Sequence, residues 1–195
     1  MKKFLPILVI LGLLALAVMY YVNTNNRFVE MKGQATKQWA NVESSYQRRS
    51  DLIPNLVNTV KGAADFEKET LTAVIEARAK ATSTTIDPSK LSAENMAQFQ
   101  QAQDGLSGAL SRLLVSVERY PELKANQNFR DLQAQLEGTE NRINVERNRF
   151  NDIAGEYNIA IAKIPASIIA NLAGFDALNL FKSAPGAENA PTVEF

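Results

Sequence analysis

An apolar residue recurs at every seventh position between residues 128 and 164. The members of this repeat are Phe129, Leu136, Ile143, Phe150, Tyr157 and Ile164. Such a repeat is typical of a helix that keeps one stripe buried against neighbouring helices. No proline interrupts the stretch, so it predicts one helix of about 37 residues, about 55 Å long.

The second apolar stripe of this helix is interrupted. Its positions hold Leu132, Thr139, Glu146, Ile153 and Ala160. Because a two-stranded coiled coil requires aliphatic residues in both stripes, the pattern favours a helix of a larger bundle with a polar stretch at mid-length. Glu137 and Glu140 are expected on its solvated face.

Asparagine follows three of the buried positions, as Asn144, Asn151 and Asn158. Asparagine is a mediocre helix former because its amide competes for backbone hydrogen bonds. The regular spacing predicts a ladder of amides that bonds to a neighbouring helix and fixes the register of the bundle. The alternative is a ladder that faces another subunit or a ligand, so the three residues are candidate partner-binding residues.

Composition argues against several classes of function. The chain has 195 residues, no net charge and no basic block beyond its N-terminus, so it lacks the electrostatic features of a nucleic-acid-binding protein. It contains no cysteine and no histidine. These absences remove disulfides, thiol nucleophiles, Ser-His-Asp triads and imidazole metal ligands. We therefore expect no enzymatic activity, no cofactor and no bound metal.

The N-terminal residues have the features of a membrane anchor. Residues 4–22 carry no charge, and as a helix of about 28 Å they nearly match the hydrocarbon thickness of a bilayer. A cleaved signal peptide is the alternative, since residues 15–17 read Ala-Leu-Ala, but the apolar run continues past that site. Lys2 and Lys3 favour a cytoplasmic N-terminus and a body on the exported side.

The segment around Pro54 is the most unusual part of the next expected helix, at residues 28–60. Proline lacks a backbone donor, so it predicts a kink or a restart, for which Asp51 is a suitable N-cap. Arg48, Arg49 and Asp51 are expected to form a local charge cluster that braces the kink. The alternative is an elbow at which these three residues bind a partner.

Other helices are expected on both sides of the long one. Residues 66–81 and a helix opened by Ser92 continue the helical pattern, with a loop between them. Pro165 stops the long helix, and a short apolar helix follows that Gly174 ends. Phe175, Leu178, Leu180 and Phe181 are expected to cover the end of the bundle or to rest on a membrane surface or another subunit.

These segments predict an all-α protein: an antiparallel up-and-down helical bundle with long helices, preceded by one N-terminal transmembrane helix. The expected division is an anchor at residues 1–25, a helical bundle at 26–182 and a flexible tail at 183–195. The tail ends in Val193-Glu194-Phe195, an apolar pattern with a free carboxylate of the kind that PDZ-type domains bind. Val193 and Phe195 are therefore candidate partner-binding residues; a solvated tail is the alternative.

Two motifs are specific enough to indicate a family. They are RRSDLIPNLV at residues 48–57 and YPELKAN at residues 120–126, with shorter matches around Trp39, Arg78 and Glu140. With them the chain resembles the LemA family of bacterial membrane-anchored helical proteins over residues 28–181. Phe150 departs from the family pattern, which more often has tyrosine there. The resemblance implies a single-pass protein of the bacterial inner membrane, no catalytic motif, and an association with envelope organisation and membrane proteases.

From these observations we expect a membrane-anchored scaffold that organises partner proteins or assembles with itself. Its expected partners are membrane lipid, through the N-terminal helix, and proteins, which include a second copy in a homo-oligomer. The alternative is an adaptor or sensory module that regulates a membrane protease or signalling protein.

Overall fold

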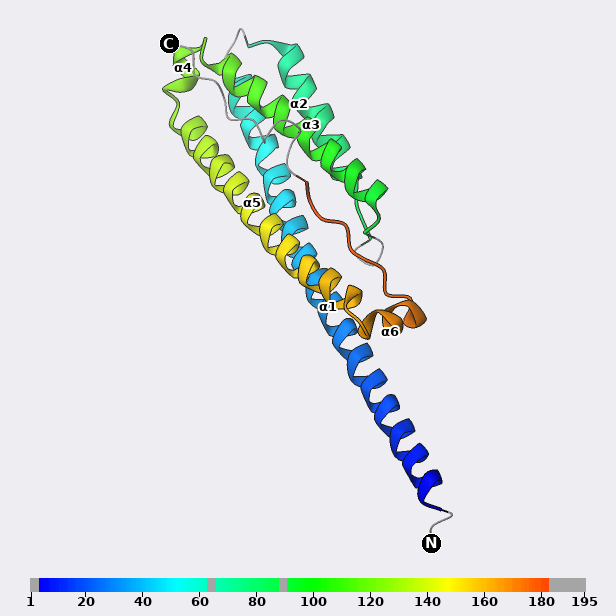
Figure 1. The fold of residues 1–195 in the computed structure, drawn as a ribbon. Coiled ribbons are helices and arrows are strands. Elements are labelled where there is room, and N and C mark those ends of the chain that lie inside the picture. The colour runs from blue at the N-terminus through cyan, green and yellow to red at the C-terminus, as the bar shows by residue number, and fades with distance from the viewer. Residues whose placement is uncertain (1–3, 63–65, 88–90, 183–195) are drawn as a thin grey trace, which may run out of the picture.

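The computed structural model describes residues 4–62, 66–87 and 91–182, which are mostly helical and contain no strand. Four long helices form the body: α1 (Leu5–Lys61), α2 (Lys68–Ser83), α3 (Ala93–Val117) and α5 (Gln127–Ala162). The short helix α4 (Pro121–Lys124) lies between α3 and α5, and the short helix α6 (Ala166–Ala173) follows α5. Figure 1 shows α1 and α5 side by side and antiparallel, with α2 and α3 paired next to them. The predicted all-α, up-and-down bundle is confirmed.

Helix α1 joins the expected anchor to the bundle. It has 57 residues, about 86 Å of helix, and it passes the boundary expected after residue 25 without a break. Its N-terminal part projects from the bundle (Figure 1), and its large apolar side chains from Ile7 to Val22 are exposed. By length and composition, α1 is the one helix in the described ranges that could cross a membrane.

Pro54 lies inside α1 and does not divide it, so the expected restart and the N-cap role of Asp51 were wrong. Because proline has no N–H, the carbonyl oxygen of Ser50 loses its donor within the helix. Nε of Arg78 on α2 donates to that oxygen at 2.8 Å. A contact between helices thus replaces the missing hydrogen bond, and α1 continues.

Helix α5 confirms most of the seven-residue repeat. Phe129, Leu136, Ile143, Phe150 and Tyr157 are all buried. The sixth member, Ile164, is 87% exposed because α5 already ends at Ala162 and Pro165 follows. The predicted start of α3 is also confirmed, since the Ser92 side chain accepts a hydrogen bond from the backbone N–H of Asn95.

The core is divided into two apolar clusters. The cluster nearer the projecting half of α1 is centred on Trp39, which is fully buried and stacks on Phe181 with 5.5 Å between ring centroids. The second cluster joins α1, α2, α3 and α5 at the far end. Between them lie Arg49 on α1, Gln103 on α3 and Glu140 on α5, which we call the polar layer.

The chain after α5 returns along the bundle. Helix α6 ends at Gly174 as predicted, and this glycine has the left-handed conformation with φ of 71°. Residues 175–182, here called the strap, then run along the bundle without regular secondary structure (Figure 1). Leu178 and Phe181 of the strap are buried against the core. Residues 183–195, with Val193 and Phe195, lie outside the described residues.

Candidate functional site

Arg49 is the centre of the polar layer. Its side chain is 1% exposed, and Nη1 donates to Oε1 of Glu140 at 2.7 Å and to Oγ of Ser107 at 2.8 Å. Nη2 donates to Oε1 of Gln103 at 2.6 Å, and the guanidinium carbon lies 5.1 Å from the centroid of the Tyr46 ring. A buried cation is tolerated only with such a set of partners. Arg49 therefore ties α1 to α3 and α5.

The expected charge cluster of Arg48, Arg49 and Asp51 does not form. Adjacent residues of a helix point about 100° apart, so Arg48 faces away from the layer that Arg49 enters. Arg48 and Asp51 are exposed, and Asp51 accepts a hydrogen bond from Nε2 of Gln47 at 2.8 Å. Glu140 was expected on the solvated face and is instead the half-buried ion-pair partner of Arg49.

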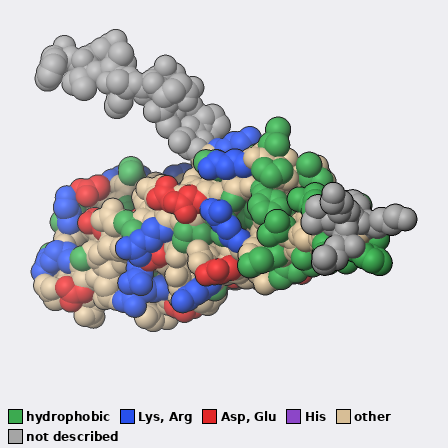
Figure 2. Space-filling model, turned by 60° about the horizontal axis from the view of Figure 1, so that its bottom comes forward, with side chains coloured by type: hydrophobic (Ala, Val, Ile, Leu, Met, Phe, Trp, Pro, Cys, Tyr) green, Lys and Arg blue, Asp and Glu red, His purple; other side chains and the backbone are tan. Residues whose placement is uncertain are grey.

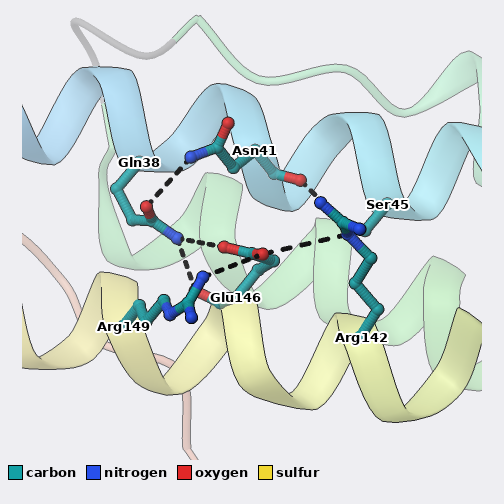
Figure 3. A network of polar contacts seen from close by, with 6 residues as sticks. All are labelled: Gln38, Asn41, Ser45, Arg142, Glu146 and Arg149. Atoms are coloured by element: carbon teal, nitrogen blue, oxygen red, sulfur yellow. Dashed lines mark hydrogen bonds and ion pairs between the residues drawn. The ribbon is translucent and has the colours of Figure 1, made fainter.

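A second polar network joins α1 to α5 (Figure 3). Its centre is Glu146, whose side chain is 5% exposed although it carries a carboxylate. Nε2 of Gln38 donates to Oε2 of Glu146 at 2.7 Å. Arg149 and Arg142 approach Oε1 at 3.3 and 3.9 Å. The interrupted stripe predicted from the sequence is thus a buried polar contact between the two longest helices.

An open groove of about 730 Å³ lies between α1 and α5, next to this network. Asn41, Ser45 and Arg142 belong to both (Figure 3). Nδ2 of Asn41 donates to Oε1 of Gln38 at 3.0 Å, so the inner wall of the groove is held by the network. The complete lining is Asn41, Ser44, Ser45, Gln47, Arg48, Asp51, Gln135, Gly138, Thr139 and Arg142. Amides, hydroxyls and charges of both signs suit the binding of a polar polypeptide surface.

Asn151 and Asn158 bind the strap, whereas a neighbouring helix was expected as their partner. Nδ2 of Asn158 donates to the carbonyl oxygen of Leu178 at 2.8 Å, and the N–H of Leu178 donates to Oδ1 at 2.8 Å. Asn151 forms the same pair with Phe181, at 3.0 and 2.9 Å. Seven helical residues rise about 10.5 Å and three extended residues span about 10 Å, so the two spacings match.

The predicted partner-binding residues therefore fall into three groups. Arg48 and Asp51 line the groove, and the exposed side chain of Asn144 makes no hydrogen bond to another described residue. Arg49, Asn151 and Asn158 use their polar atoms within the chain. Val193 and Phe195 lie outside the described residues.

Sequence reasoning missed Gln38 and Gln103, and it assigned no contact to Glu146. The available signal was the polar pair Thr139 and Glu146 within an otherwise apolar stripe, since a carboxylate in a buried stripe requires a partner on the facing helix. Nothing in the sequence identifies that partner, because Gln38 is 108 residues away.

Burial raises the pKa of two groups on α1, Tyr46 and Glu43. For the Tyr46 hydroxyl the positive charges of Arg147 and Arg49 oppose this effect. Both side chains line a cavity of about 70 Å³, which holds a few water molecules only. In the described part of the chain, no group of three or more His, Cys, Asp or Glu residues is placed to hold a metal ion.

The sequence of this chain is similar to those of several known proteins. The chain is 26% identical to the magnetosome protein MamQ of Magnetospirillum gryphiswaldense, over 94% of this chain and 75% of that protein. It is 25% identical to MamQ 1 of Paramagnetospirillum magneticum, over 94% and 72%. It is 22% identical to Protein LemA of Metamycoplasma hominis, over 82% and 69%.

A model of one protein family covers most of the chain. The match extends over residues 38–195, which include α2, α3, α5 and α1 from Gln38 onward. It also includes Arg49, Pro54, Arg78 and Glu140, so the residues of the polar layer and of the proline contact lie inside the matched region. The chain belongs to the LemA family.

Proposed function

We propose that this protein is a membrane-anchored helical scaffold of the bacterial envelope. It organises partner proteins, or assembles with copies of itself, and has no catalytic activity. The observation that carries the proposal is the continuity of α1, because the helix able to cross a membrane is also the central helix of the bundle. The similarity to MamQ and to Protein LemA supports the membrane association.

The groove between α1 and α5 is the proposed partner site. Arg48 lies 26 residues after Val22 on the same helix, about 39 Å along its axis. A continuous helix holds the groove at that height above the membrane, where a neighbouring membrane protein can contact it. Arg48, Asp51 and Arg142 supply charged groups at the opening.

The absence of catalysis is part of the proposal. The buried charged groups, Arg49 and Glu146, are bonded to partners in the chain and are not directed at an open cavity. Such buried networks fix the register of helices, whereas catalytic groups need free capacity toward a substrate. The small cavity beside Glu43 and Tyr46 does not admit a substrate of ordinary size.

Site-specific photo-cross-linking in living cells tests the partner site. A photoreactive residue replaces Arg48 in the groove, and the matched control replaces Arg112, an exposed arginine on α3. We expect discrete adducts from the position of Arg48 and none of the same mass from the position of Arg112. An adduct with twice the 21.5 kDa of the chain indicates self-assembly, and other masses indicate another protein.

The outcome also separates the scaffold from the adaptor alternative. An adduct with a membrane protease or a signalling protein, together with changed activity of that protein in cells that lack this chain, would favour the adaptor. Identical adducts from both positions, or none from either, would contradict the groove as a partner site.

A further inference from the structure

The short helix α6 carries an unpartnered apolar face. Ile168 and Leu172 are 60% and 76% exposed, and Ile164, just before the helix, is 87% exposed. Residues four apart lie on one face of a helix, so Ile168 and Leu172 form a row, here called the outer face of α6. Ile169 and Ala170 are buried in the core, which holds α6 to the bundle.

The position of α6 along α1 is well defined. Figure 1 shows α6 at the end of the bundle from which α1 projects. Phe175, directly after α6, packs edge-on against Phe28 of α1 with 5.4 Å between ring centroids. Thr24 is already buried at 9% exposure, two residues or about 3 Å of helix past Val22, where the apolar run ends.

The exposed apolar residues of α1 and α6 therefore meet at one level of the molecule. Figure 2 shows hydrophobic side chains gathered at one end, whereas most of the charged side chains lie on the remainder of that view. The headgroup region of a bilayer adds about 5–8 Å on each side of the hydrocarbon. With α1 inserted to Val22, the end of the bundle lies within that region.

We propose that the outer face of α6 is a second membrane contact, which rests at the boundary between headgroups and acyl chains of the bilayer that holds α1. Helices that lie in this boundary bury an apolar face about 5–10 Å deep. The occupant is lipid because α6 packs beside α1 near the level where the exposed apolar surface of the anchor ends, and lipid surrounds that surface. Two contacts at different points fix the tilt of α1, and so the direction in which the bundle projects. The proposal rests on the insertion of α1.

Labels at single cysteines test this contact in the full-length protein, because the chain has no cysteine of its own. The variants are Ile168→Cys and Leu172→Cys on the outer face. Leu13→Cys, 62% exposed on the anchor, reports insertion of α1, and Val115→Cys, 71% exposed near the end of α3, is the matched control. Each carries an environment-sensitive fluorophore in vesicles of phosphatidylcholine and phosphatidylglycerol. Quenching by spin-labelled lipid and by aqueous iodide is then compared.

We expect lipid quenching at both outer-face positions to exceed that at Val115 several-fold, and iodide quenching to be correspondingly weaker. Outer-face labels that behave like the label at Val115 would overturn the proposal. Protection from iodide without lipid quenching would also overturn it, since a second copy would then cover the face. If the label at Leu13 is not quenched by lipid, the anchor itself fails and the α6 contact fails with it. If lipid quenches the label at Leu13 but not the labels at Ile168 and Leu172, α1 is inserted and only the α6 contact fails.

Discussion

At the scale of single residues, two adjacent arginines have opposite environments. Arg49 is enclosed and bonded to two other helices, α3 and α5, whereas Arg48 is exposed at the groove. We expect Arg49→Ala to lower the free energy of unfolding by about 3 kcal/mol. This is the lower end of the range for breaking a buried ion pair, because Glu140 is half exposed and water can solvate its carboxylate in the variant. Arg48→Ala, the matched control, should change it by less than about 0.5 kcal/mol. Equal denaturant midpoints for the two variants would contradict the assignment of Arg49 to the polar layer.

Phe150 provides a second test at this scale, since it is fully buried and packs against Trp39 with 5.4 Å between ring centroids. Phe150→Ala removes most of a ring from a filled core and should cost about 3–5 kcal/mol. Ile159→Ala, at a position 57% exposed on the same helix, is the control. Thermal unfolding measures both, and an unchanged midpoint for Phe150→Ala would show that this face of α5 is not buried.

At the scale of elements, the contact between α1 and α2 at Pro54 can be measured by a double-mutant cycle. Arg78→Ala leaves the carbonyl of Ser50 without its donor and should cost about 1–3 kcal/mol. In a Pro54→Ala background the new N–H of residue 54 bonds to the same carbonyl, so the cost should become smaller. Additive effects in chemical denaturation would mean that Arg78 does not substitute for the missing helical hydrogen bond.

The strap gives a second prediction for elements. The N–H groups of Leu178 and Phe181 donate to the side chains of Asn158 and Asn151. Asn151→Ala with Asn158→Ala should therefore accelerate hydrogen exchange in peptides that cover the strap, because local opening then breaks fewer bonds. Asn144→Ala is the control and should leave this exchange unchanged. Slow exchange of the strap in the double variant would indicate that apolar burial of Leu178 and Phe181 holds it without the amides.

At the scale of the whole molecule, α1 is continuous, so the membrane orientation of its N-terminus determines on which side every later element lies. Lys2 and Lys3 favour a cytoplasmic N-terminus, which places every element after α1 on the exported side. A reporter fused after Phe195 that functions only outside the cytoplasm should be active, and a cytoplasm-only reporter should be silent. In a variant with Lys2→Gln and Lys3→Gln, the difference in activity between the two reporters should become smaller. Activity of the cytoplasm-only reporter with the natural sequence would reverse the orientation.

Much of the fold could be predicted because it depends on signals local in the chain. The repeat at residues 128–164 predicted α5 to within two residues at each end. Ser92 begins α3, and Pro165 and Gly174 bound the short helix, because each acts on the backbone next to it. The apolar run at the N-terminus likewise needs no tertiary contact to be recognised.

The same locality explains the expectations that were wrong. Pro54 breaks an isolated helix, but Arg78 arrives from another helix to replace the lost hydrogen bond. The spacing of Asn151 and Asn158 predicted a ladder, but the strap they bind comes from residues 20 to 30 positions later. In each case the deciding group lies on a different segment of the chain.

The sequence by itself determined the limits of α5, the start of α3, the end of α6, which stripes are apolar and where the apolar run of α1 lies, because these follow from the periodicity and chemistry of neighbouring residues. Only the tertiary structure decided which polar residues are buried and what they bind. Arg48 and Arg49 have the same chemistry, yet rotation about the helix axis places one at the groove and the other in the polar layer. A buried charge is stable only where distant segments bring acceptors to it, and their arrival depends on how the whole chain packs.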